Sequence, residues 1–332
     1  MKILFAGTPK TSSIILKNLI DLGHDVIGVI TQPDKKRGRR AIESPSPVSE
    51  IARSNDIKQY KPTNLNDLEF KNTVSNNEFD VLVVVAYGKI LPKWLLDLPN
   101  IMPVNIHFSL LPKYRGASPI QSSLLNGDTE TGITFIKMTE GLDSGEIIHK
   151  DIIKIKKNHN KLSLEDDLVN LAIINIDKLF SKLSDKKLTL IKQKDELATY
   201  CSKINKEDSL INFNMRSIEI YNIFKAFIEW PLTKFIYNDI EIIIRDMYVS
   251  EDISNLLGDS TYTILIVDSA GCTFDTSFYV AQPSPLNVNE NVVNVSCFGG
   301  NDGSAELVIS GGSFPYFVSW GAIGLASCSL SL

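Results

Sequence analysis

Residues 81–86 have the sequence VLVVVA and form the strongest β-strand signal in the chain. The segment is apolar at every position and rich in β-branched side chains, so neither face of the strand carries polar residues. Strands that are apolar on both faces are typical of the centre of a parallel sheet, because helices cover both sides of such a sheet. We therefore predict an α/β domain with this strand near its middle.

Further strand signals lie before and after this segment. Short apolar runs at residues 3–6 and 26–30 and a further short strand at residues 104–107 are separated by segments long enough to form helices. The alternation of strands and helices predicts right-handed crossovers and a doubly wound, mostly parallel sheet. Two later runs, at residues 133–138 and 147–155, predict an additional β pair.

The composition excludes several classes of protein. The 332 residues include 43% hydrophobic and 22% charged residues, with 15 Phe and 10 Tyr, so the chain is not largely disordered. No stretch approaches the roughly 18 unbroken apolar residues that a membrane-spanning helix needs. The first residues stop being apolar too early for a signal peptide. We therefore expect a soluble, cytoplasmic protein without a membrane partner.

Charge is distributed unevenly along the chain. Residues 251–332 contain 8 acidic residues and no Lys or Arg, whereas residues 1–250 contain 34 basic and 31 acidic residues, a net charge of +3. The acidic stretch shows only short strand-like runs between Gly, Ser and Asn, so we expect it to be β-rich. Such a change of composition predicts two unlike parts.

Three polar residues fall where open α/β sheets place their ligands. Asn105 and His107 alternate along one predicted strand, so their side chains point to the same side near its carboxyl end. Asp143 lies in the glycine-flanked loop GLDSG at residues 141–145. An amide donor, an imidazole and a carboxylate suit a reaction that passes through an oxyanion. An Asn-x-His pair taken alone is weak evidence for a site and more often has a purely structural role.

The sequence around these residues is more specific. Residues 105–121 (NIHFSLLPKYRGASPIQ) closely resemble the signature of methionyl-tRNA formyltransferases. Further matches to this family are FAGTP at residues 5–9, VVAYGKILP at residues 84–92 and the GLDSG loop. The resemblance extends from residue 1 to about residue 250. It implies a cytoplasmic enzyme of translation initiation that uses 10-formyltetrahydrofolate as formyl donor and initiator methionyl-tRNA as acceptor.

The resemblance also implies roles for individual residues. The α-amine of methionyl-tRNA attacks the formyl carbon, and Asn105 and His107 donate hydrogen bonds to the oxyanion that develops. Asp143 orients His107 and helps to move the proton of the amine. No metal is needed. The residues implied to border the folate are Ser109, Leu110, Leu111 and Pro112.

Five basic residues lie close together before the first proline-rich stretch. They are Lys35, Lys36, Arg37, Arg39 and Arg40. Without further context, such a run indicates a solvated surface loop. The resemblance implies instead that this loop contacts the acceptor end of the initiator tRNA, where basic side chains would make binding depend on salt.

The resemblance divides the chain into four parts. Residues 1–187 correspond to the formyltransferase catalytic domain, residues 188–204 to a Lys-rich linker, and residues 205–250 to the opening of an OB-like barrel that is incomplete. Residues 251–332 resemble the SprB-type repeats of secreted bacterial adhesins. Cys272 and Cys297 in this last part could pair in an oxidising compartment.

Two alternative functions are compatible with parts of the sequence. A formyl transfer to a small amine, such as glycinamide ribonucleotide or a nucleotide-linked amino sugar, would use the same three polar residues. The basic run and residues 115–121 favour the tRNA substrate over these amines. The acidic tail alone suggests a surface-adhesion module. We expect a monomer that binds folate and tRNA but not DNA.

Overall fold

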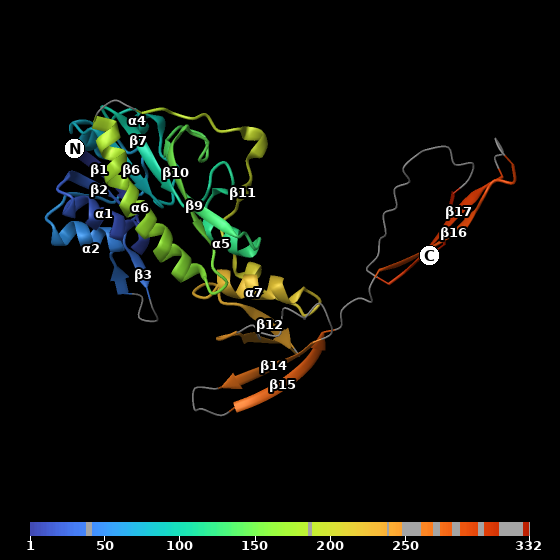
Figure 1. Cartoon of the computed structure of the whole chain (residues 1–332). Coiled ribbons are helices and arrows are strands. Elements are labelled where there is room, and N and C mark those ends of the chain that lie inside the picture. Colours follow the sequence, from blue (N-terminus) through green and yellow to red (C-terminus); the bar gives the residue numbers. More distant parts are fainter. Residues whose placement is uncertain are drawn as a thin grey trace. The chain divides into compact units, whose positions relative to one another are not determined.

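The computed structural model describes residues 1–37, 42–184, 188–237, 239–247, 260–267, 273–280, 286–297, 302–311 and 328–331. The chain forms two compact units, Met1–Tyr248 and Val249–Leu332. Figure 1 shows the first unit as a central sheet covered by helices. None of the helices in the described ranges combines the length and the apolar character that crossing a membrane requires.

The central sheet of the first unit has seven strands in the order β10-β9-β7-β6-β1-β2-β5. Strands β1, β2, β5, β6 and β7 are parallel to one another, whereas β9 and β10 are antiparallel to their neighbours. The prediction of a doubly wound, mostly parallel sheet is confirmed. The strands are β1 (Lys2–Gly7), β2 (Asp25–Ile30), β5 (Gln59–Tyr60), β6 (Val81–Val85), β7 (Met102–His107), β9 (Glu130–Lys137) and β10 (Ile147–Lys154).

Strand β6 lies at the middle of this sheet, between β1 and β7, and all five of its side chains are buried. Leu82 and Val84 on one of its faces join a core cluster with residues of α3 (Leu68–Ser75) and α4 (Lys93–Leu96). The other face of the sheet carries α1 (Lys10–Asp21) and α6 (Lys161–Ser184), which pack against each other. Cover on both faces explains why the strand contains no polar residue.

The remaining helices begin at short capping motifs. Helix α2 (Pro47–Ser54) begins after Ser46, whose hydroxyl accepts a hydrogen bond from the backbone N–H of Ser49. Helix α5 (Pro119–Leu125) has proline at its first position, where the missing N–H costs nothing. Helix α7 (Ser217–Ala226) packs against α5 and carries the chain away from the sheet.

Short elements complete the first unit. Strand β8 (Arg115–Gly116) pairs in parallel with β11 (Tyr200–Cys201), and β3 (Lys35–Arg37) pairs in antiparallel with β4 (Ile42–Ser44). Two 3₁₀ turns, η1 (Asp195–Leu197) and η2 (Lys206–Ser209), flank β11. Strands β12 (Lys234–Tyr237) and β13 (Ile240–Ile243) form a two-stranded hairpin, which corresponds to the predicted start of a barrel.

The described residues of the second unit are strands and their flanking turns, as expected for a β-rich tail. Strand β14 (Ser260–Val267) pairs with β15 (Thr273–Val280) in an antiparallel hairpin. A separate three-stranded sheet contains β16 (Asn287–Val293), β17 (Ser304–Ser310) and β18 (Cys328–Ser331). Cys297 is a free, exposed thiol, whereas Cys272 lies outside the described residues, so the pairing of these two cysteines stays a prediction.

Candidate active site

The structure brings the three predicted catalytic residues together. Asn105 and His107 point to the same side of β7, and Asp143 faces them from the loop at residues 138–146 between β9 and β10. Nδ2 of Asn105 donates a hydrogen bond of 3.2 Å to Oδ1 of Asp143. Nδ1 of His107 lies 3.6 Å from Oδ2 of the same carboxylate. Asn105 and His107 are only 8% and 5% exposed, so the cluster is largely shielded from water.

The cluster lies beside the switch point of the sheet, where the order in which strands are added changes direction. The chain passes from β1 outward to β2 and β5, then returns to β6 and continues outward to β7 on the other side. Open α/β folds bind their ligands at the carboxyl ends of the strands at such a reversal, which here lies between β1 and β6. The carbonyl of Tyr87, just after β6, accepts hydrogen bonds of 3.1 Å from Thr8 Oγ1 and Gln32 Nε2. The loops after β1, β2 and β6 are thereby tied to one another.

The tautomer of His107 follows from its hydrogen bond. Nε2 of the ring lies 2.8 Å from the backbone carbonyl of Tyr114. Because a carbonyl oxygen can only accept, Nε2 carries the proton in this contact. Nδ1 is therefore the nitrogen that faces Asp143 and can take up or release a proton there.

The Asp143 carboxylate is also held by the backbone of the loop that follows β7. The N–H of Gly116 donates a hydrogen bond of 2.9 Å to Oδ2. Gly116 has a φ of +125°, and a Cβ atom at this position would lie 2.2 Å from the carbonyl oxygen of Cys201. Only glycine fits there, because β8 must approach β11 closely.

The loop that carries Asp143 is tightly folded. Asp143 itself has a φ of +46°, in the left-handed region that few residues other than glycine, Asn and Asp adopt. A Cβ atom on Gly145 would lie 1.8 Å from the carbonyl oxygen of Lys137. The GLDSG sequence therefore satisfies a backbone requirement as well as supplying the carboxylate.

A buried polar residue that the sequence did not indicate, Gln193, contacts this loop and is held in turn by the buried Arg115. Gln193, in the segment predicted as a linker, donates through Nε2 to the carbonyl oxygens of Asp143 (2.8 Å) and Gly145 (2.7 Å). Its Oε1 accepts from Nε (3.1 Å) and Nη2 (2.9 Å) of Arg115. Nη2 of Arg115 also lies 2.8 Å from Asp195. A single glutamine between two lysines gives no sequence pattern that would reveal this role.

The four residues predicted to border a folate lie on one loop but differ in burial. Ser109 and Leu111 are fully buried, whereas Leu110 and Pro112 are half-buried. The hydroxyl of Ser109 donates to the carbonyl of Lys113, and Thr134 Oγ1 donates to the carbonyl of Ser109. The side chains of Ser109 and Leu111 therefore support the loop from within. Surface for a ligand is left on Leu110 and Pro112.

The described part of the basic run lies on a strand that pairs with its neighbour in the chain, β4. Lys35, Lys36 and Arg37 form β3, whereas Arg39 and Arg40 fall outside the described residues. The base of this strand pair is closed by a hydrogen bond of 2.7 Å between the hydroxyls of Thr31 and Ser46. The three described cations therefore lie on a strand, not in an irregular loop.

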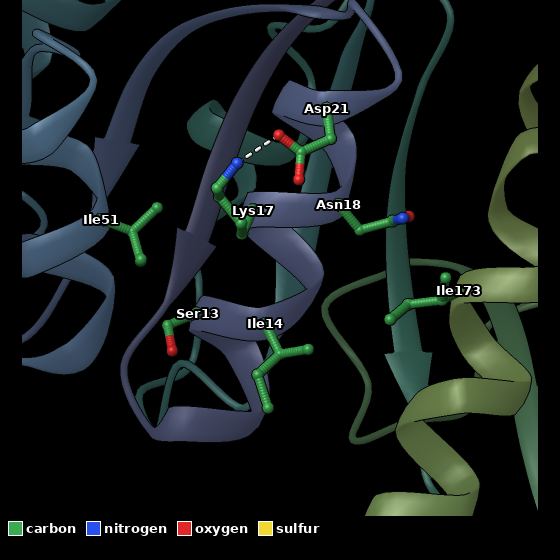
Figure 2. A pocket seen from close by; sticks show the side chains of 7 residues that line it. All are labelled: Ser13, Ile14, Lys17, Asn18, Asp21, Ile51 and Ile173. Atoms are coloured by element: carbon green, nitrogen blue, oxygen red, sulfur yellow. Dashed lines mark hydrogen bonds and ion pairs between the residues drawn. The ribbon is translucent and has the colours of Figure 1, made fainter.

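Two open hollows on the first unit lie apart from the three catalytic candidates. One, of about 360 Å³, lies between α1, α2 and α6, and Figure 2 shows the ion pair of Lys17 and Asp21 on its rim. The other, of about 430 Å³, follows the Tyr87 loop and includes Lys89 and Ile90. Within the described ranges, no group of three or more His, Cys, Asp or Glu residues could hold a metal ion.

Sequence profiles of known families define the class of protein to which this fold belongs. The sequence profile of the formyl transferase family matches residues 1–174, and that of its C-terminal domain matches residues 203–275. The chain belongs to the formyl transferase family. The C-terminal match extends past residue 250, where the resemblance was expected to end. The SprB repeat profile matches residues 289–321.

Individual relatives support the same assignment. The methionyl-tRNA formyltransferase of Caldanaerobacter subterraneus subsp. tengcongensis is 42% identical over 232 residues, which cover 70% of this chain and 75% of that protein. The N-formyltransferase from Helicobacter canadensis, solved with folinic acid and dTDP-3-aminofucose, has a TM-score of 0.58 at 20% identity and covers 85% of this chain and 99% of its own. A 4-N formyltransferase from Francisella tularensis has a TM-score of 0.58 at 19% identity, with 73% and 96% covered. These two structures share the fold.

Proposed function

We propose that this chain transfers the formyl group of 10-formyltetrahydrofolate to the α-amine of methionyl-tRNA, the modification of the initiator tRNA in translation initiation. The observation that carries the proposal is the 42% identity with a methionyl-tRNA formyltransferase over 70% of the chain. The cluster of Asn105, His107 and Asp143 supplies the groups that such a transfer needs. The enzyme would act as a cytoplasmic monomer, with no DNA or membrane partner.

Asn105 is suited to stabilise the oxyanion that forms when the amine adds to the formyl carbon. Its Nδ2 carries two hydrogens, and the contact with Asp143 uses one of them. The second hydrogen is free to donate to the developing negative charge. A donor fixed in a buried site needs no reorganisation at that moment, and one such donor is typically worth about 3 kcal/mol in the barrier.

His107 and Asp143 are suited to handle the proton of the attacking amine. With Nε2 fixed on the carbonyl of Tyr114, Nδ1 faces the reacting side and can accept that proton. The imidazolium so formed is stabilised by the Asp143 carboxylate 3.6 Å away and can donate Nδ1–H to the oxyanion. When the intermediate collapses, the bond between the formyl carbon and N10 of the folate breaks, and the imidazolium returns the proton to N10. Asp143 keeps its orientation through the N–H of Gly116.

We expect a folate donor to bind at the loops around this cluster. The donor supplies an activated formyl group, and the residues of this chain position it. The folinic acid in the Helicobacter canadensis structure supports a folate-type donor on this fold. Leu110 and Pro112 offer half-buried apolar surface beside β7, and Ser109 and Leu111 hold their loop in place from the core.

The acceptor is recognised by charge as well as by its amine. Lys35, Lys36 and Arg37 on β3, together with Arg39 and Arg40, would contact phosphates of the tRNA acceptor end. A small amine without phosphates along a backbone would gain little from five adjacent cations.

Competing acceptors test the proposal. The purified chain would be supplied with 10-formyltetrahydrofolate and, in separate reactions, with methionyl-tRNA, glycinamide ribonucleotide or a dTDP-linked amino sugar. We expect kcat/KM for methionyl-tRNA to exceed that for each small amine by at least about 10²-fold. A higher kcat/KM for either small amine would overturn the assignment of the acceptor.

A further inference from the structure

The segment of residues 188–204, which lies between α6 and α7 in the chain, contacts the loop that carries Asp143. Gln193 is the centre of this contact and is 5% exposed. Its Nε2 donates to two carbonyl oxygens of the loop, and its Oε1 accepts twice from Arg115. Both ends of the amide are therefore fully used. A buried amide with this many directed partners fixes the position of the groups around it.

Arg115 fixes Gln193 in turn. Its side chain is 3% exposed and bonds both Gln193 and Asp195. Burial alone would lower the pKa of Arg115, but hydrogen bonds with Asp195 and Tyr200 outweigh it and raise the pKa. The guanidinium therefore stays charged, and its Nε–H and Nη2–H groups stay directed at Oε1 of Gln193.

These contacts meet at Asp143 from two sides. Gln193 holds the backbone carbonyl of Asp143, while Gly116, the neighbour of Arg115, holds its carboxylate through an N–H at 2.9 Å. The backbone of Asp143 is in the left-handed region, with a φ of +46°, so it needs support from its surroundings. A ring of contacts through Arg115, Gln193, Asp143 and Gly116 supplies this support.

We propose that Gln193 is a positioning residue that sets the place of the Asp143 carboxylate opposite Asn105 and His107, with Arg115 holding Gln193 in position. The inference rests on the proposed formyl transfer. Gln193 affects catalysis only through the position of Asp143. A displacement of about 1 Å at a catalytic group can cost about 10²-fold in rate.

The sharpest variant is Gln193→Glu, because it keeps the size of the side chain and its acceptor toward Arg115. It loses the two N–H donors and places a carboxylate against two carbonyl oxygens. We expect kcat to fall by about 10- to 100-fold while KM for methionyl-tRNA changes by less than about 2-fold. Glu196→Gln, an exposed change in the same segment, is the matched control and should leave both constants unchanged.

A double-mutant cycle separates positioning from a general structural role. Single-turnover rates would be measured for the parent, Gln193→Glu, Asp143→Asn and the double variant. If Gln193 acts through Asp143, adding Gln193→Glu to Asp143→Asn lowers the rate by less than about 2-fold. Multiplicative losses in the double variant, or a fall in kcat that matches a loss of folded protein in thermal melts, would overturn the proposal.

Hydrogen exchange gives a readout that does not depend on activity. In Gln193→Glu, the amide of Gly116 and those of residues 139–146 should exchange at least about 10-fold faster, while amides of β6 keep the parental rate. Unchanged exchange at Gly116 would contradict the positioning role. If the parent formylates a different amine, the cycle is run with that amine, so a wrong acceptor and a wrong role for Gln193 give different results.

Discussion

At the scale of single residues, the two polar side chains of β7 make different contacts. Asn105 keeps a free N–H, whereas His107 presents Nδ1 to Asp143 because Nε2 is bound to a carbonyl. We predict that Asn105→Ala or His107→Ala lowers the rate of formyl transfer by about 10²-fold or more, the usual cost of losing one oxyanion donor. The affinity for a folate should change little. Steady-state kinetics with methionyl-tRNA and equilibrium binding of folinic acid check both statements, and near-parental turnover in either variant would contradict the proposed roles.

A second prediction at this scale concerns His24, far from the catalytic cluster. Burial lowers the pKa of His24 below its ordinary value of 6.5, and its Nε2 is buried without a partner against Phe180. The folded state thus binds the proton more weakly than the unfolded state, so folding becomes less stable as the pH falls below about 6.5. His24→Phe should remove this part of the pH dependence. Urea unfolding at pH 5.5 and 7.5 measures it, and an equal loss of stability in parent and variant would refute the prediction.

At the scale of elements, the pair of β3 and β4 is the feature most directly tied to the acceptor. Replacing Lys35, Lys36, Arg37, Arg39 and Arg40 with Ser should weaken tRNA binding and flatten its salt dependence. Removing one cation that pairs with a phosphate makes the slope of log K against log salt shallower by roughly one unit. Filter binding at several salt concentrations gives the slope. Unchanged affinity and slope would assign the basic run to a solvated surface.

The sequence predicted the elements whose hydrophobic pattern is clear. The uninterrupted apolar run of β6 predicted the centre of the sheet, and the spacing of Asn105 and His107 placed them on one side of β7. Asp143 was found through its glycine-flanked motif. Gln193 was missed because its partners lie about 50 and 78 residues away along the chain. Strand β3 was missed because three adjacent cations show no strand pattern.

At the scale of the whole molecule, the chain combines a complete catalytic unit with an acidic tail. The hairpin of β12 and β13 exposes Ile236, Tyr237 and Ile240, which a closed barrel would cover. We predict that replacing the residues after 250 with a complete barrel of the formyl transferase family raises tRNA affinity and turnover and reduces aggregation. Folate affinity should stay the same. The acidic tail has a net charge of −8 and would repel tRNA phosphates.

The comparison requires both proteins at equal concentration. Gel-shift titration with methionyl-tRNA gives the affinity, light scattering gives the aggregation, and initial rates give the turnover. Equal tRNA binding and equal turnover in the two proteins would show that the hairpin and the tail already supply what a barrel supplies.

The parallel pairing of β8 with β11 has a consequence for how this gene can recombine. One small sheet joins residues 115–116 to residues 200–201. The chain that packs with the catalytic residues therefore extends to Cys201, beyond the predicted domain boundary at residue 187. A crossover between residues 187 and 193 would take Gln193 from another parent than Asp143, and one between residues 193 and 200 would divide the pair of β8 and β11 between two parents. A crossover near residue 250 leaves every contact of the catalytic cluster within one parent. Exchange of the C-terminal part is therefore compatible with an intact catalytic unit, and sequence-defined domain ends are a poor guide to where such genes can be joined.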